Sequence, residues 1–183
     1  MTRRTHLVGA IFIGLLLERI TALFDWPILP MGLTFQLGQI TMPAYILAIT
    51  ALTLGALYPC LDEVGSRDRP TMFHWLVTSL GTAIVFSLAG LFFRFPDFGF
   101  WFFLGALSHL GLDLLTESGL AVLGPFTNHR FHLLPRGYRL VRGSLAEDVL
   151  SLVLSVIAAG LLFWSISALP DFIIIRPNFR SPF

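Results

Sequence analysis

Six side chains in this sequence have the chemistry to bind or assist a metal ion, and each lies at the end of an apolar run. The clearest pair is His109 and Asp113 in GALSHLGLDLLTESG, residues 105–119. Residues four apart share one face of a helix, so both can reach one ion, or one can orient the other. The other four are His6, Asp62, His74 and Glu147.

Imidazole and carboxylate groups gathered in this way suit a divalent metal. Zinc takes neutral histidine nitrogens and carboxylate oxygens as ligands. A metal with an open coordination position lowers the pKa of water to about 7 and supplies hydroxide for hydrolysis. Taken singly, each residue also has a structural interpretation: the pair at 109 and 113 can hydrogen-bond at a membrane interface, and Glu147 can cap a helix after Ser144.

The composition places these residues in a membrane protein. The 183 residues are 55% hydrophobic and 14% aromatic, with a mean hydropathy of +0.79, well above the range of soluble domains. The net charge is +1, all twelve basic residues are arginines, and they form no basic stripe, so nucleic acid is not expected as a partner. A single cysteine, Cys60, excludes an internal disulfide.

Charge-free runs predict an all-α, multi-spanning fold, because a helix needs about 20 apolar residues to cross the hydrocarbon core. We expect about four to five transmembrane helices in one domain, residues 1–183. Residues 26–42 carry several prolines and glycines and predict one re-entrant or interfacial segment. The predicted spans are residues 7–24, 43–59, 72–93, 98–116 and 148–169, with a polar segment at 117–147.

The arginines orient this topology, since short arginine-rich loops stay in the cytoplasm. A cytoplasmic N-terminus puts eight arginines on that side: Arg3, Arg4, Arg67, Arg69, Arg130, Arg136, Arg139 and Arg142. The same topology brings all six candidate residues to the cytoplasmic face, although it was not built from them. Their convergence favours a metal site over six separate structural roles.

Two other polar groups have simpler interpretations. Glu18 and Arg19 stand inside the first span, where a charge normally faces a partner, a cavity or the far interface. His129 and His132 are spaced as metal ligands, but turn residues and arginines surround them, which favours a loop role. A proton-relay transporter is the weakest alternative, because the polar residues gather on one side.

Four segments together resemble the YdjM-like family of inner-membrane-associated proteins, assigned as metal-dependent hydrolases and also labelled LexA-binding or LexA-regulated. They are TRRTHL, LYPCLDEVGSRDRPTMFHW, GALSHLGLDLLTESGLAVLGPF and RLVRGSLAEDVL, in that order. The resemblance extends to about residue 155. SHLxLDLLT, followed by GPF and then GSLAE, is its most specific part.

The resemblance implies a set of metal ligands and one acidic group. Carried over by motif, the ligands are His6, Asp62, His74, His109 and Asp113, and Glu147 is a ligand or general base. The chain departs from the family at two places: Cys60 stands where PDxD has its first carboxylate, and RPTMFHW replaces HRGxTHS. Cys60 can still bind zinc as a thiolate or serve as a small apolar side chain.

We therefore predict a metal-dependent hydrolase at the cytoplasmic face of a bacterial or archaeal inner membrane. Its cofactor is a divalent metal, zinc with manganese as the alternative. Membrane lipids are partners, and the substrate is an ester or phosphoester, including lipid-derived ones. The alternative is a non-catalytic membrane protein that recruits a partner or stabilises an assembly, with a degenerate or purely structural metal site.

Overall fold

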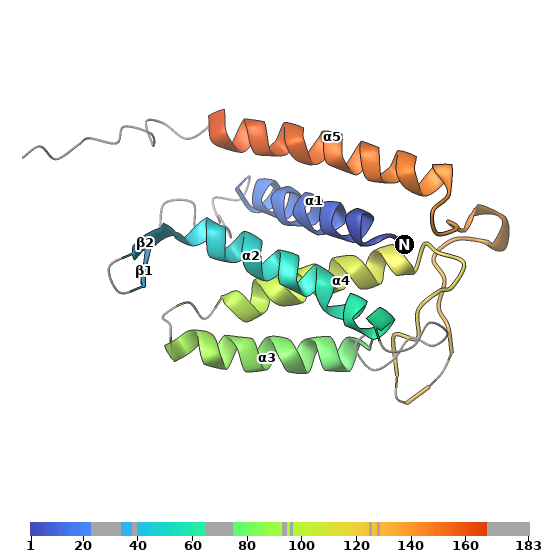
Figure 1. Ribbon diagram of the computed structural model, residues 1–183, viewed down its shortest axis with the longest axis horizontal. Coiled ribbons are helices and arrows are strands. Elements are labelled where there is room, and N and C mark those ends of the chain that lie inside the picture. Colours follow the sequence, from blue (N-terminus) through green and yellow to red (C-terminus); the bar gives the residue numbers. More distant parts are fainter. Residues whose placement is uncertain are drawn as a thin grey trace, which may run out of the picture.

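The computed structural model describes residues 1–22, 34–37, 40–64, 75–92, 95, 97–124, 126, 127 and 129–167. The helices lie side by side, and successive long helices run in opposite directions (Figure 1). The long helices of this part are α1 (Arg3–Ala22), α2 (Ala44–Leu57), α3 (Leu76–Phe92), α4 (Phe98–Asp113) and α5 (Leu145–Ser167).

The prediction of a helical protein is confirmed, and the helices fall on the predicted spans to within a few residues. Among the described residues, α5 contains a stretch long and apolar enough to cross a membrane, Leu145–Trp164. Ile46–Leu61 and Leu76–Leu91 are apolar but shorter. The number of four to five crossings therefore stays a prediction.

A short hairpin was not predicted. Strands β1 (Thr34–Leu37) and β2 (Ile40–Pro43) pair antiparallel, with Thr34 opposite Pro43, at the start of α2. Threonine, isoleucine and phenylalanine favour strands, which accounts for pairing in this part of the predicted interfacial segment. The rest of that segment, 26–33 with 38 and 39, lies outside the described residues.

Helix α4 is the centre of the bundle and contacts α1, α2 and α3, while α5 packs on α1. Glycines let α2 and α4 approach closely. A Cβ built on Gly55 would lie 1.9 Å from the Phe102 carbonyl oxygen, and one on Gly105 would lie 2.0 Å from that of Leu52. Small residues at such positions are typical of helix contacts in membranes. This contact fixes how far α2 can move relative to α4.

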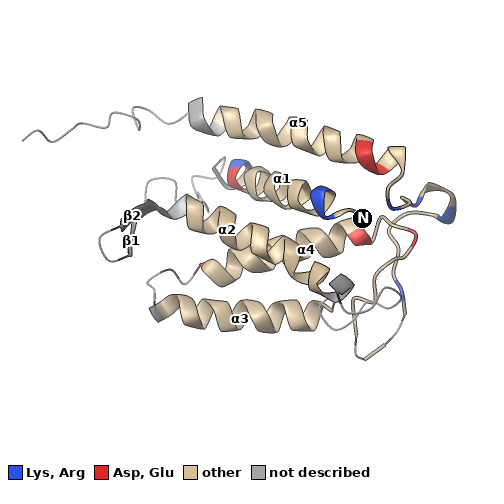
Figure 2. Ribbon diagram, in the orientation of Figure 1, with Lys and Arg blue, Asp and Glu red and all other residues tan. Residues whose placement is uncertain are grey.

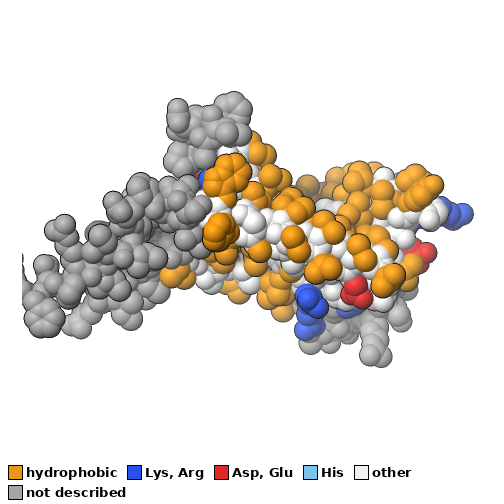
Figure 3. All heavy atoms as spheres, turned by 90° about the horizontal axis from the view of Figure 1, so that it is seen from above, with side chains coloured by type: hydrophobic (Ala, Val, Ile, Leu, Met, Phe, Trp, Pro, Cys, Tyr) orange, Lys and Arg blue, Asp and Glu red, His pale blue; other side chains and the backbone are white. Residues whose placement is uncertain are grey.

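The outer faces of the bundle are apolar. Val85 on α3 and Leu152, Val156 and Phe163 on α5 are between 61% and 76% exposed, and Figure 3 shows apolar side chains spread over one face of the molecule. Within the described part, the charged residues of the long helices lie near the helix ends (Figure 2). An apolar band therefore separates two polar ends, as a bilayer requires.

Candidate metal centre

Three of the predicted ligands meet at one end of the bundle. His6 lies in the first turn of α1, and His109 and Asp113 lie in the last turns of α4. Because α1 and α4 run in opposite directions, the start of one lies beside the end of the other (Figure 1). The structure thus joins residues more than 100 positions apart, as the topology predicted.

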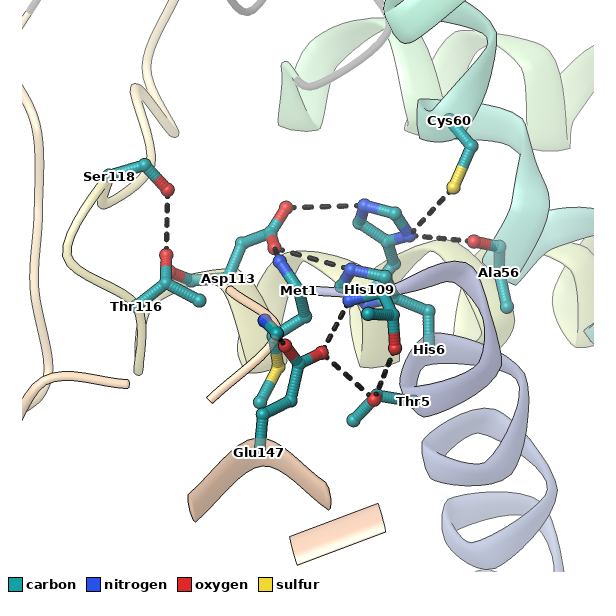
Figure 4. Close-up of polar contacts among 12 residues, drawn as sticks. Met1, Thr5, His6, Ala56, Cys60, His109, Asp113, Thr116, Ser118 and Glu147 are labelled. Carbon is teal, nitrogen blue, oxygen red and sulfur yellow. Dashed lines mark hydrogen bonds and ion pairs between the residues drawn. The ribbon is translucent and has the colours of Figure 1, made fainter. Parts of the chain in front are cut away.

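The Asp113 carboxylate is the centre of this His–His–Asp cluster (Figure 4). Its Oδ2 lies 3.2 Å from His109 Nε2, and its Oδ1 lies 3.4 Å from His6 Nε2. The backbone nitrogen of Met1 is 3.6 Å from Oδ1. Both histidines are 2% exposed and Asp113 is 8% exposed, so the carboxylate is stabilised by these neighbours and not by bulk water.

The Ala56 carbonyl sets the orientation of the His109 ring. His109 Nδ1 donates a hydrogen bond of 2.7 Å to this oxygen at the end of α2. A carbonyl can only accept, so Nδ1 carries a hydrogen and the neutral ring presents the lone pair of Nε2 to Asp113. Two acceptors facing each other are unfavourable unless a proton or a cation lies between them. Metal-ligating histidines show this arrangement, with the second nitrogen bonded to a carbonyl or carboxylate.

His6 completes the cluster from α1. Its ring stacks on that of His109, with centroids 3.5 Å apart and planes 10° apart. His6 Nδ1 is buried and has no hydrogen-bond partner among the described residues. The nitrogen that faces the Asp113 carboxylate is the other one, Nε2.

The cluster fits a divalent metal. One ligand atom from each of His6, His109 and Asp113 can be chosen so that all three lie within 4.8 Å of one another. Two imidazole nitrogens and a carboxylate oxygen are a donor set that zinc accepts, and manganese also binds carboxylate and imidazole. Three protein ligands leave room for a further one, as in catalytic zinc sites.

Cys60 lies on the other side of His109. Its sulfur is 4.0 Å from Nδ1, the nitrogen that bonds the Ala56 carbonyl, and it is not part of the cluster of potential ligands. It is buried, with 6% exposure. In this arrangement Cys60 contacts the His109 ring at the nitrogen that faces away from Asp113.

Glu147 is buried beside the cluster, but it faces backbone and hydroxyl donors. Its Oε1 accepts from the Thr5 hydroxyl at 2.9 Å and from the Thr2 backbone nitrogen, and its Oε2 accepts from the Gly143 nitrogen at 2.7 Å. Its own backbone nitrogen donates to the Ser144 hydroxyl at 3.3 Å, the N-terminal cap expected for α5. Glu147 therefore ties the start of α5 to the start of α1, next to His6.

The remaining predicted ligands are not placed in the cluster. Asp62 lies in the 3-10 helix η1 (Tyr58–Val64), which continues α2 at this end, but its side chain is outside the described part. His74 lies outside the described residues. His132 belongs to the polar segment instead, where its Nδ1 donates to the Thr116 carbonyl at 3.2 Å and its ring fills the space above Gly119, a residue with φ of +60°.

Sequence reasoning missed the Ala56 carbonyl and the two threonines that bind Glu147. A backbone carbonyl leaves no signal in residue type. Thr2 and Thr5 did offer a signal, because their hydroxyls lie in the same short segment as His6. In the structure these two hydroxyls bond each other at 2.9 Å.

The fold and the cluster define a class: a helical protein with an apolar exterior and a buried, metal-type His–His–Asp site at one end of its bundle. The family model described as YdjM inner membrane protein matches residues 1–172, so the chain belongs to the YdjM family. This confirms the resemblance drawn from the sequence motifs. Comparisons with curated proteins and with solved structures found no match.

Proposed function

We propose that this protein is a metal-dependent hydrolase that acts on an ester or phosphoester at the cytoplasmic face of the inner membrane. The observation that carries the proposal is the contact between His109 Nε2 and Asp113 Oδ2, 3.2 Å apart while Nδ1 donates to the Ala56 carbonyl. With Nδ1 protonated, a cation is the natural partner for the lone pairs of Nε2 and the carboxylate.

His6, His109 and Asp113 would hold the metal, which we take to be zinc with manganese as the alternative. When bound with an open position, such an ion activates water for attack on a carbonyl or phosphoryl centre. Asp62 and His74 remain proposed as further ligands.

Glu147 is proposed to act by positioning His6. Its two oxygens accept three hydrogen bonds from Thr2, Thr5 and Gly143, and it is 0% exposed. These three bonds take up most of the carboxylate's roughly four lone-pair sites, which leaves little capacity for a general base. Its predicted role as general base stays open to test, and the two roles differ in their kinetics.

The proposed topology is multi-pass, with about four to five crossings and the N-terminus in the cytoplasm. It rests on the alternating helix directions (Figure 1), the apolar outer faces and the arginines near the cluster. The site would then lie at head-group depth, where it can reach an amphiphilic ester or phosphoester without extracting it from the bilayer.

The test is a hydrolysis assay on protein purified in detergent and reloaded with zinc or manganese. Nitrophenyl esters and phosphoesters with short and long alkyl chains should be turned over by the wild type, with preference for long chains. Asp113→Asn should lose turnover, and the exposed Asp148→Asn at the same end should keep it. Equal turnover in wild type and Asp113→Asn would refute the proposal.

One observation favours a second candidate, a non-catalytic membrane protein with a structural metal. All three cluster residues are at least nine-tenths buried, as in a closed site that joins α1 to α4. Under this candidate the protein binds metal in full stoichiometry, hydrolyses none of the substrates, and loses thermal stability when the metal is chelated.

A further inference from the structure

The segment that joins α4 to α5, residues 114–144, exposes large apolar side chains at the end of the bundle that carries the His–His–Asp cluster. Phe126 and Leu133 are 82% and 69% exposed, and Leu123 and Phe131 are 48% and 39% exposed. Single apolar side chains are common on protein surfaces, whereas a contiguous group of them marks an interaction site.

These four side chains lie together. Leu123, Phe131 and Leu133 line one open depression of about 430 Å³. The backbone nitrogen of Phe126 donates to the Leu123 carbonyl at 2.9 Å, so Phe126 is one tight turn away from the same depression. We call these four residues the apolar surface of the α4–α5 segment.

Backbone hydrogen bonds hold the apolar surface in place. The backbone nitrogen of Leu133 donates to the carbonyl of Leu114, directly after the end of α4, at 2.8 Å. The backbone nitrogen of Leu76, at the start of α3, donates to the Val122 carbonyl at 3.3 Å. The apolar surface is therefore fixed relative to both helices.

This part of the segment projects sideways from the bundle. Its yellow to gold stretch passes the end of α3 and extends lower in the view than any helix (Figure 1). In a membrane, the space beside a bundle of helices is filled with lipid. The stretch therefore overhangs the leaflet around the bundle, where head groups and the first methylene groups can cover an apolar surface.

The charge of the segment is positive throughout. Residues 118–146 contain no acidic residue and carry four arginines, Arg130, Arg136, Arg139 and Arg142. Blue stretches lie in the loops beyond the helix ends (Figure 2). Arg130 is exposed and adjoins Phe131, and its Nη1 donates to the Ser118 carbonyl at 3.0 Å. This bond positions the guanidinium and uses one of its five N–H groups.

We infer that the α4–α5 segment docks on the anionic head-group region of the leaflet around the bundle. Its apolar surface enters the interface, and Arg130 pairs with a lipid phosphate. Guanidinium groups bind phosphate through paired N–H donors, and basic segments next to membrane helices are attracted to anionic lipids. The sideways projection favours the membrane over a protein partner, because the lipid already lies beneath this surface.

This inference goes beyond the proposed hydrolase, since it assigns a lipid contact to residues outside the cluster of potential ligands. It rests on the proposed placement of the bundle in the membrane. It depends neither on metal binding nor on catalysis.

The experiment uses the full chain in nanodiscs with one nitroxide label. It compares collisions of the label with oxygen, which dissolves in the bilayer, and with a neutral nickel chelate, which stays in water. Leu133→Cys labels the apolar surface, and Val156→Cys labels the middle of α5, where it reports the placement of the bundle itself. Unsubstituted protein gives the background from Cys60, which is buried.

Gly137→Cys is the matched control within the segment. It labels an exposed position in the 3-10 helix η3 (Arg136–Tyr138). This helix belongs to the brown part of the segment, which extends farthest beyond the helix ends (Figure 1). In nanodiscs of mixed phosphatidylcholine and phosphatidylglycerol, we expect the labels at positions 133 and 156 to favour oxygen and the label at position 137 to favour the nickel chelate.

The role of charge is tested by lipid composition and by Arg130→Gln. In the mixed nanodiscs, Arg130→Gln should lower the ratio of docked to undocked segment about fivefold, the effect of one arginine near an anionic surface. Phosphatidylcholine alone should lower this ratio at least as much in the unchanged segment. Equal protection of position 133 in the two lipid compositions would overturn the assignment to anionic lipid.

An aromatic pair tests the apolar part at constant charge. Phe126→Ser should shift the label at position 133 toward the nickel chelate, and Tyr138→Ser, 77% exposed in η3, should leave it unchanged. If the label at position 133 favours the chelate while the label at position 156 favours oxygen, docking is overturned and the topology stands. Preference for the chelate at both positions would refute the membrane placement and, with it, the docking.

Discussion

The two ends of the helix bundle differ in whether their buried polar groups have partners among the described residues. At the end with the His–His–Asp cluster, side chains from α1, α4 and α5 mostly satisfy one another, and a carbonyl of α2 orients His109. At the other end, the donors of Arg19 and Trp101 have no partner among the described residues and adjoin an apolar groove.

This difference separates an end of the bundle that gathers polar groups of the chain from an end whose groove has an apolar lining. Buried histidines and a carboxylate held by the chain itself form a rigid place for a small ion. The close contact of α2 and α4 through Gly55 and Gly105 connects the two, because it sets the spacing of both ends.

The largest effect on stability is expected from breaking the close contact between α2 and α4. Gly105→Ala puts a methyl group 2.0 Å from the Leu52 carbonyl oxygen, so the helices must separate. We expect a loss of about 3 kcal/mol in the free energy of unfolding, together with weaker metal binding, because Ala56 moves with α2. The loss in the free energy of unfolding is measured by denaturation in detergent, monitored by circular dichroism.

Gly111→Ala on the same helix is the control. Nothing lies within 4 Å of a Cβ at Gly111, so alanine should be neutral or add about 0.5 to 1 kcal/mol through its higher helix propensity. Similar destabilisation by the two variants would show that glycine packing between α2 and α4 does not set the structure.

A smaller effect is expected from loosening the cluster end through Glu147. Glu147→Gln keeps the shape but removes an acceptor oxygen from the bonds to Thr2, Thr5 and Gly143. Metal affinity should fall roughly 10- to 100-fold, as for other residues that orient ligands. Competition with a chelating dye measures the metal dissociation constant, and Asp148→Asn serves as the exposed control.

Kinetics distinguish positioning from catalysis at this residue. If Glu147 only positions His6, turnover at saturating metal should stay within a few-fold of wild type. A large loss of kcat with unchanged metal affinity would instead establish Glu147 as a general base.

The smallest effect concerns the opposite end. Trp164→Leu removes the ring above Arg19 and should lower the free energy of unfolding by about 0.5 to 1 kcal/mol. Phe163→Leu, 76% exposed and on the same helix, should have less effect. Metal content should be unchanged in both variants, since the change lies at the far end. Metal loss in Trp164→Leu would mean that the two ends are coupled more tightly than the packing indicates.

The sequence predicted the parts of this structure that follow from hydropathy and helix direction. Charge-free runs located the helices, and alternating directions brought His6 to His109 and Asp113. Both signals are local in the chain, and the i, i+4 spacing of 109 and 113 needs only a helix.

What could not be predicted depends on contacts between distant backbone groups. The Ala56 carbonyl that orients His109 carries no signal in residue type, and the two threonine partners of Glu147 lie 145 and 142 positions away. The hairpin at 34–43 depends on pairing between two short strands, which hydropathy does not encode.

The most direct test of the account is metal content by elemental analysis of protein purified in detergent. Wild type is compared with a His109→Ala, Asp113→Asn double variant and with a matched control, His129→Ala, Glu117→Gln, which removes one imidazole and one carboxylate outside the cluster. We expect stoichiometric zinc or manganese in wild type and control, and none in the double variant. Metal retained by the double variant, or none in wild type after reconstitution, would contradict a metal centre at His6, His109 and Asp113.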